Sequence, residues 1–273
     1  MNGAVPALDL HTTRTTATNR REQGRVSVQP GVIEIPREIH LFPLADVATE
    51  QPAVEEVFPA ERSERVCRAL NVSVALLAMI ILSPIYLLVA LAVRLTSRGA
   101  VLYSQVRVGV DRRYNRESTY ERRGQDHGGK PFMMYKFRSM QVNAESNGQA
   151  VWAMKRDPRV TLVGRVLRRT RLDELPQLYN VLRGEMNIVG PRPERPTIFA
   201  DLRASIPEYP MRQRVKPGIT GWAQINQSYD ACVDDVRKKV QYDLEYVQRQ
   251  GLVEDLRIMS MTVPVMLFGR GGW

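Results

Sequence analysis

The sequence contains little cysteine, and its two cysteines are far apart. Only Cys67 and Cys232 occur in 273 residues, in a pattern that fits neither a disulfide framework nor a cysteine-based metal site. Two isolated cysteines favour a reducing compartment. The sequence also lacks the helix-turn-helix, zinc and aromatic ribonucleoprotein signatures that are typical of nucleic-acid-binding domains.

The first 62 residues lack regular hydrophobic periodicity. They contain no early apolar run, so we expect no secretory signal peptide. Residues 1–29 are rich in threonine, arginine, alanine and asparagine, and prolines recur from Pro30 to Pro59. This composition predicts that residues 1–62 form a disordered N-terminal tail.

Basic residues outnumber acidic ones, and the excess is unevenly distributed. The formal net charge is +10. Residues 1–68 carry 8 basic and 10 acidic residues, so the rest of the chain carries 31 and 19, a net charge of +12. A surface of this charge suits anionic lipid, nucleic acid or phosphorylated ligands.

One segment, Ala69–Val93, has the composition of a membrane helix. It carries no charge over 25 residues, which is long enough to cross a bilayer. Ser83-Pro84 interrupts it, and basic residues flank both of its ends, so the positive-inside rule gives no orientation. A straight span and a re-entrant hairpin both remain open, and a buried soluble helix is the third alternative.

Downstream, short strands and helices alternate. Residues 101–110 and 131–140 alternate as strands do, and a charged, glycine-containing loop at 111–129 separates them. We expect turns at 157–161 and 186–193, and a turn with a short extended piece at 215–226. Helices are expected at 162–169, from near Asp173 through Leu182, within 194–211, at 234–250, and at 252–268 as an amphipathic helix.

Two adjacent carboxylates, Asp173 and Glu174, follow a run rich in arginine. Pro176 suits the first turn of a helix and disfavours helical angles at Leu175, so we expect a helix to start near Asp173. The free N–H groups of a helix start favour an anion such as phosphate. Neighbouring helical side chains point about 100° apart, which suggests two different roles for the pair. Simple capping is the alternative interpretation.

Three further basic residues are candidates for binding phosphate. Lys136 and Arg138 would share one face of the second strand. Arg192 lies between Pro191 and Pro193 and follows Gly190, so the backbone would present it rigidly. Guanidinium groups match phosphate geometry well, although solvated charges and an ordinary turn are the simpler alternatives.

Taken together, these blocks resemble the bacterial sugar transferases, the monotopic polyprenyl-phosphate phosphoglycosyl transferases. The resemblance covers about residues 64–272, and the blocks occur in the family's order. The loop at 111–129 is longer than the family's usual connection, and the multi-span N-terminal region of larger members has no counterpart in these residues. The matching stretches are Ser83-Pro84, Lys136–Met140, Asp157–Thr161, Leu172–Leu178 with Asn180, Ile188–Pro193 and Pro217–Gln224.

The resemblance implies a specific chemistry. A UDP-sugar would give its sugar phosphate to Asp173, forming an acyl phosphate, and UMP would leave. A polyprenyl phosphate, typically undecaprenyl phosphate, would then accept the sugar phosphate, and Glu174 would help to hold Mg²⁺. Elementary chemistry agrees, because a carboxylate can act as a covalent nucleophile if cations neutralise the diphosphate.

We therefore expect a mostly helical α+β protein that catalyses the first membrane step of polysaccharide or glycoconjugate assembly. Residues 1–62 would be the tail, 63–98 a membrane-embedded re-entrant helix, and 99–273 a small catalytic domain with amphipathic interfacial helices. That domain would lie on the cytoplasmic face of the inner membrane, without nucleic acid, and a homo-oligomer is an open alternative to a monomer. The alternative function is that of a membrane-tethered protein that binds anionic lipid or nucleic acid without catalysis.

Overall fold

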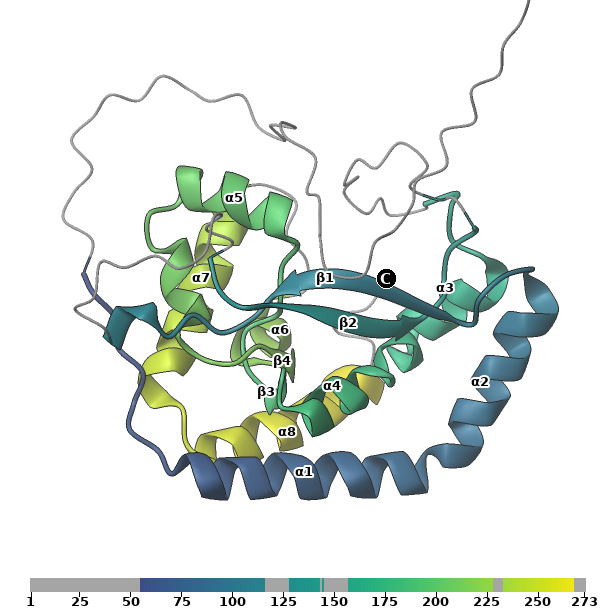
Figure 1. The fold of residues 1–273 in the computed structure, drawn as a ribbon, viewed down its shortest axis with the longest axis horizontal. Helices are drawn as coiled ribbons and strands as arrows, with labels where there is room; N and C mark the ends of the chain where they lie inside the picture. The colour runs from purple at the N-terminus through teal and green to yellow at the C-terminus, as the bar shows by residue number, and fades with distance from the viewer. Residues whose placement is uncertain (1–54, 116–127, 143, 145–156, 228–232, 268–273) are drawn as a thin grey trace, which may run out of the picture. The chain divides into compact units, whose positions relative to one another are not determined.

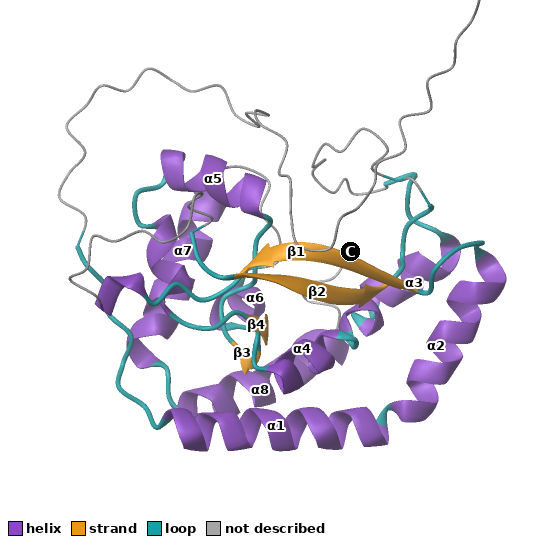
Figure 2. Ribbon diagram, in the orientation of Figure 1, coloured by secondary structure: helices purple, strands orange, loops and turns teal. Residues whose placement is uncertain are grey.

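The computed structural model describes residues 55–115, 128–142, 144, 157–227 and 233–267, all within one unit of the chain, Glu38–Trp273 (Figure 1). Helices predominate and strands are short, so the domain is mostly helical α+β, as the sequence predicted (Figure 2). The helices of the described residues are α1 Glu64–Ile81, α2 Ser83–Thr96, α3 Leu162–Arg169, α4 Gln177–Arg183, α5 Pro196–Ser205, α6 Trp222–Asn226, α7 Val233–Arg249 and α8 Leu252–Leu267.

Helices α1 and α2 form a bent pair. Their axes differ by 63° across a break at Leu82, where Ser83 and Pro84 begin α2. Proline has no N–H to continue a helical ladder, and the Ser83 hydroxyl donates to the Ile80 carbonyl at 2.8 Å. Among the described residues, no single helix is long and apolar enough to cross a membrane, whereas this pair satisfies both criteria together.

The longest strands form an antiparallel pair. Strand β1, Leu102–Val108, pairs with β2, Pro131–Phe137, in a register that sets Tyr103 opposite Lys136. Both strands lie where alternation predicted them, but β2 ends before Arg138. The connection expected at 111–129 contains a short 3₁₀ turn at Arg113–Asn115, and residues 116–127 lie outside the described part.

A second strand pair is parallel and very short. Strand β3, Asn187–Val189, pairs with β4, Gly218–Thr220. The sequence prediction of a plain turn at 186–193 missed β3, because three residues are too few to establish an alternating pattern. It also missed α6, because the five residues Trp222–Asn226 are too few to establish a helical period.

The predictions for α3, α5, α7 and α8 are confirmed to within a few residues. Helix α3 has the predicted bounds, α7 begins at Val233, and α8 contains Pro264 within it. Helix α5 ends at Ser205, and a 3₁₀ turn follows at Tyr209–Arg214.

The end of the expected tail is packed against the domain. Val57 is buried beside Tyr246 and Ile258, and the Ala60 N–H donates to the Val247 carbonyl at 3.0 Å. Val57 and Ala60, which fall within the expected tail, therefore contact the domain. Residues 1–54 lie outside the described part.

Candidate active site

The two adjacent carboxylates occupy a tight turn rather than the start of an α-helix. Leu172–Glu174 is a 3₁₀ turn, and α4 begins only at Gln177 after the capping Pro176. The predicted helix start near Asp173 is thus wrong by one turn. Leu175 has helical angles, φ −51° and ψ −39°, contrary to expectation. Its N–H donates to the Leu172 carbonyl at 3.3 Å, and this 3₁₀ bond helps to hold Leu175 helical in spite of the proline.

Arg171 has a left-handed backbone conformation just before this turn. Its φ of 54° is in the left-handed region, the only positive φ among the described non-glycine residues. Such a conformation costs about 1 kcal/mol or more outside glycine and often marks functional sites. It separates α3 from the turn that carries Asp173 and Glu174.

Glu174 is paired with two cations. The Arg192 guanidinium donates to both of its carboxylate oxygens, at 2.5 and 3.2 Å, and Lys136 Nζ lies 3.4 Å from Oε1. Burial alone would raise the pKa of Glu174, but the charges of Arg192 and Lys136 outweigh it and hold the pKa well below its usual range. Glu174 therefore stays ionised.

Asp173 has a different environment although it is equally buried, with both residues 7% exposed. Within the described part of the chain, no hydrogen bond reaches its carboxylate. Burial raises the pKa of Asp173 to about 6; Lys136 opposes this shift and the charge of Glu174 adds to it. Two adjacent carboxylates in contrasting environments are typical of sites where each has its own task.

Lys136 reaches the pair from β2, and Asn180 fixes that strand. The fully buried Asn180 side chain donates to the Met133 carbonyl at 2.7 Å and accepts from the Tyr135 N–H at 3.2 Å. It thus takes the place of a third strand. Burial lowers the pKa of Lys136 to about 8, although Glu174 counteracts this effect.

Arg138, the third predicted phosphate ligand, is engaged elsewhere. It lies beyond the end of β2, and its guanidinium donates to the carbonyls of Ser97 and Arg98 at 2.8 and 2.9 Å. The structure thus brings Lys136 and Arg192 to the carboxylates, while Arg138 joins the end of α2 to the end of β2.

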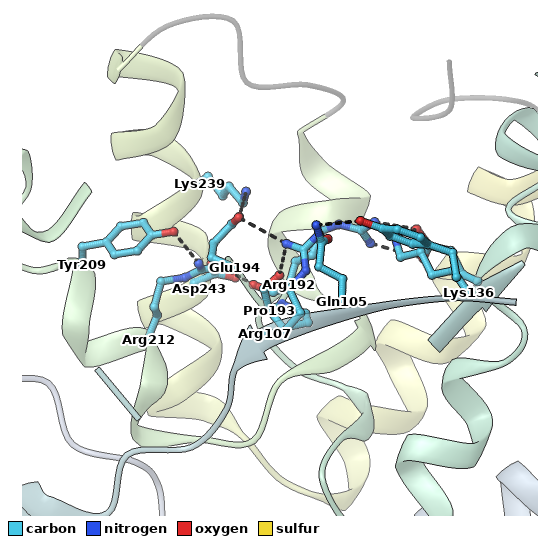
Figure 3. A network of polar contacts seen from close by, with 12 residues as sticks. Gln105, Arg107, Lys136, Arg192, Pro193, Glu194, Tyr209, Arg212, Lys239 and Asp243 are labelled. Carbon is cyan, nitrogen blue, oxygen red and sulfur yellow. Dashed lines mark hydrogen bonds and ion pairs between the residues drawn. The ribbon is translucent and has the colours of Figure 1, made fainter. Parts of the chain in front are cut away.

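Arg192 is carried by a loop that we call the arginine loop, residues 190–194. The Gly190 N–H donates to the Thr220 carbonyl at 2.9 Å; Pro191 and Pro193 have no N–H, so the rest of the loop is anchored through its carbonyl groups (Figure 3). Each of the four carbonyls from Pro191 to Glu194 accepts one hydrogen bond. The donors, in order, are the Gly218 N–H, the Arg212 and Arg107 guanidinium groups and the Val108 N–H, at 2.9–3.0 Å.

Sequence reasoning missed the two arginines that hold this loop. Arg212 is fully buried, bonded to Asp243 at 2.6 Å and to the Tyr209 hydroxyl at 2.8 Å (Figure 3). Burial lowers the pKa of Arg107 to about 10, partly offset by Glu194. Arg107 is a charged residue within an alternating strand, which is a signal that could have been followed. Arg212 lies in a 3₁₀ turn without a periodic pattern, so the sequence around it contains no signal of its role.

The pair also offers oxygen ligands of the type that Mg²⁺ prefers. Among the residues that the structure describes, no group of three or more acidic, histidine or cysteine side chains could hold a metal. Mg²⁺ commonly binds through only one or two carboxylates and takes its other ligands from phosphates and water. The adjacent carboxylates of Asp173 and Glu174 fit that requirement.

The family model for bacterial sugar transferases matches residues 62–269. The chain belongs to the bacterial sugar transferase family.

Several relatives in this family have names that specify their substrates. The chain is 41% identical over 211 residues to an undecaprenyl-phosphate glucose phosphotransferase of Komagataeibacter xylinus, covering 76% of this chain and 36% of the relative. It is 39% identical over 204 residues to a UDP-N-acetylgalactosamine-undecaprenyl-phosphate N-acetylgalactosaminephosphotransferase of Aeromonas hydrophila, covering 75% and 44%.

A shorter relative matches over most of its length. It is the exopolysaccharide production protein ExoY of Sinorhizobium fredii, 38% identical over 220 residues, with 76% of this chain and 87% of the relative covered. The chain spans less than half the length of the two relatives above.

Proposed function

We propose that this bacterial sugar transferase moves a sugar phosphate from a UDP-sugar to a polyprenyl phosphate, typically undecaprenyl phosphate. The reaction releases UMP and yields a polyprenyl diphosphate sugar. Family membership and the names of the relatives support the substrate class. The observation that carries the mechanism is the contrast between Glu174, neutralised by two cations, and Asp173, whose buried carboxylate accepts no hydrogen bond in the described part.

In the first step, an Asp173 oxygen attacks the sugar-bearing phosphorus of the UDP-sugar. The bond from that phosphorus to the bridging oxygen breaks, and the electron pair leaves with UMP. Asp173 then carries the sugar phosphate as an acyl phosphate. An oxygen of the polyprenyl phosphate attacks the same phosphorus in the second step and frees Asp173.

Like charges oppose both attacks, so cations must offset them. Lys136 and Arg192 already lie beside the pair and are the residues that we assign to the substrate phosphates, with Arg138 now a weaker candidate. Glu174, together with diphosphate oxygens, would hold Mg²⁺, which supplies further neutralisation of the developing charge.

The acceptor's head group stays at a bilayer surface, so the enzyme must reach one. We propose that α1 and α2 enter the inner membrane from the cytoplasmic side and return, which would leave the catalytic domain in the cytoplasm. Large apolar side chains flank the bend and are mostly exposed, as expected of a lipid-facing surface. They include Ile80 at 70%, Ile81 at 63%, Leu87 at 74% and Leu88 at 68% exposure.

The two relatives named for glucose and for N-acetylgalactosamine have almost equal identity to this chain. The decisive assay is therefore UMP release from a panel of UDP-sugars, with and without undecaprenyl phosphate. We expect one sugar to be preferred and turnover to depend on the lipid. UMP release without any lipid dependence would indicate a hydrolase, and no release from any sugar would favour the non-catalytic binding protein.

A further inference from the structure

The turn that carries Asp173 and Glu174 and the following α4 form one continuous segment, residues 172–183. Arg68 of α1 holds its far end: the guanidinium donates to the carbonyls of Val181 and Leu182, at 2.5 Å each. These carbonyls belong to the last turn of α4, where the helical ladder leaves some acceptors unused; the Val181 carbonyl also accepts from the capping Gly184 N–H at 2.9 Å. Arginine is well suited to that negative end.

Tyr86 of α2 holds the near end of the same segment. Its hydroxyl donates at 2.5 Å to the carbonyl of Leu175, the residue that follows Glu174. Its ring packs edge-on against Phe137, the residue that follows Lys136, with ring centroids 5.7 Å apart. Tyr86 therefore contacts both Leu175, the neighbour of Glu174, and Phe137, the neighbour of Lys136.

A third contact reaches the strand that leads to Arg192. Asn71 of α1 is 2% exposed, and its side-chain oxygen accepts from the Ile188 N–H of β3 at 2.5 Å. Strand β3 ends at Val189, immediately before the arginine loop. Side chains from the bent helices thus contact all three segments that supply Glu174, Lys136 and Arg192.

We propose that the bent α1–α2 pair positions the active site, with Tyr86 and Arg68 as positioning residues for the carboxylate turn. The hydrogen bonds from two differently directed helices fix both ends of residues 172–183. The angle between α1 and α2, set at the Ser83-Pro84 break, then determines where the turn that carries Asp173 lies. The kinetic part of this inference rests on the proposed function, whereas the structural part does not.

The test compares Tyr86→Phe and Arg68→Met with the full-length wild type in lipid nanodiscs. Hydrogen–deuterium exchange should show greater uptake in the peptide covering residues 171–183 in both variants. We expect Tyr86→Phe to lower kcat about five- to tenfold, as for loss of one part-buried hydrogen bond, with little change in KM for the UDP-sugar. A merely structural defect would instead lower the fraction of active enzyme and exchange protection throughout the domain.

Tyr242→Phe is the matched control, because the Tyr242 hydroxyl on α7 makes no hydrogen bond within the described residues. Its exchange and kinetics should equal those of the wild type. Wild-type uptake and kcat in both test variants would overturn the inference while leaving the transfer reaction standing. If the wild type released no UMP, the proposed function would fail, and the exchange comparison would still decide whether the helices hold the turn.

Discussion

At the residue scale, the site depends on how differently its two carboxylates are compensated. Arg192 and Lys136 stabilise the charge of Glu174, whereas Asp173 is buried with less compensation. A carboxylate with a raised pKa is a better nucleophile once ionised than one stabilised by direct ion pairs. The titration of Asp173 should therefore be visible in the pH dependence of the reaction.

We predict a bell-shaped pH profile of kcat/KM. Activity should rise as the pH increases through about 6, where Asp173 loses its proton, and fall through about 8, where Lys136 loses its charge. Lys136→Arg should remove the alkaline limb, because arginine stays charged. An acidic limb near the ordinary aspartate value of about 4 would show that burial does not raise the pKa of Asp173.

We predict that Glu174→Gln weakens the response to Mg²⁺. Loss of one charged ligand should raise the half-saturating Mg²⁺ concentration at least about tenfold and lower the rate with it. Arg192→Ala should instead raise KM for the UDP-sugar and leave the Mg²⁺ titration nearly unchanged. If the Mg²⁺ titration of Glu174→Gln matches that of the wild type, Glu174 serves only to hold Lys136 and Arg192.

Not all of these residues could be assigned from sequence. Asp173, Glu174 and Arg192 occur in stretches whose composition and order are informative. Arg138 was grouped with Lys136 because both would share a strand face, but the strand ends at Phe137. Hydrogen bonds to distant carbonyls, such as those of Arg212, leave no local pattern in a sequence.

At the element scale, α4 takes the place of a neighbouring strand along one edge of β2. Asn180 supplies the hydrogen bonds that a third strand would make, and Gly184, at φ +79°, ends the helix just beyond it. This arrangement links the helix after Glu174 to the strand that carries Lys136.

We predict that Asn180→Ala destabilises the domain by about 1–3 kcal/mol, because it leaves the part-buried Met133 carbonyl and Tyr135 N–H without this partner. Transfer activity should fall as Lys136 loses its position. Urea unfolding of detergent-solubilised protein measures the first effect. Asn226→Ala is the control, since that exposed side chain makes a single hydrogen bond to Trp222; equal losses in both variants would contradict the role of Asn180.

The break between α1 and α2 leads us to predict that both ends of the pair lie on the same side of the membrane. The arms of 18 and 14 residues are about 27 and 21 Å long, each shorter than a hydrocarbon core of about 30 Å. Single cysteines at Glu55 and Arg98, with Cys67 and Cys232 replaced, should therefore react with an impermeant maleimide from the same, cytoplasmic side.

Replacing Ser83-Pro84 with Leu-Leu should straighten the pair and move the cysteine at position 55 to the opposite side from that at position 98. Opposite labelling in the unmodified Ser-Pro background would rule out the re-entrant arrangement. It would leave the chemistry at Asp173 unaffected.

At the scale of the whole molecule, the sequence predicted the fold class, the order of the elements and the interrupted apolar segment. Hydrophobic periodicity was enough to predict α3, α7, α8 and the β1–β2 pair. It did not suffice for the three-residue strand β3, which depends on pairing with the distant β4, or for the tight turn at Leu172–Glu174. The packing of Val57 against the core is equally non-local.

The central claim is that Asp173 carries the sugar phosphate during transfer. The most direct test is mass spectrometry of the protein after incubation with its preferred UDP-sugar and Mg²⁺ but without lipid. We predict a mass gain of one sugar phosphate on the peptide containing Asp173. The adduct should disappear when undecaprenyl phosphate is added, and it should be absent from folded, membrane-bound and inactive Asp173→Asn. Undiminished transfer by Asp173→Asn, or an adduct on another residue, would contradict the claim.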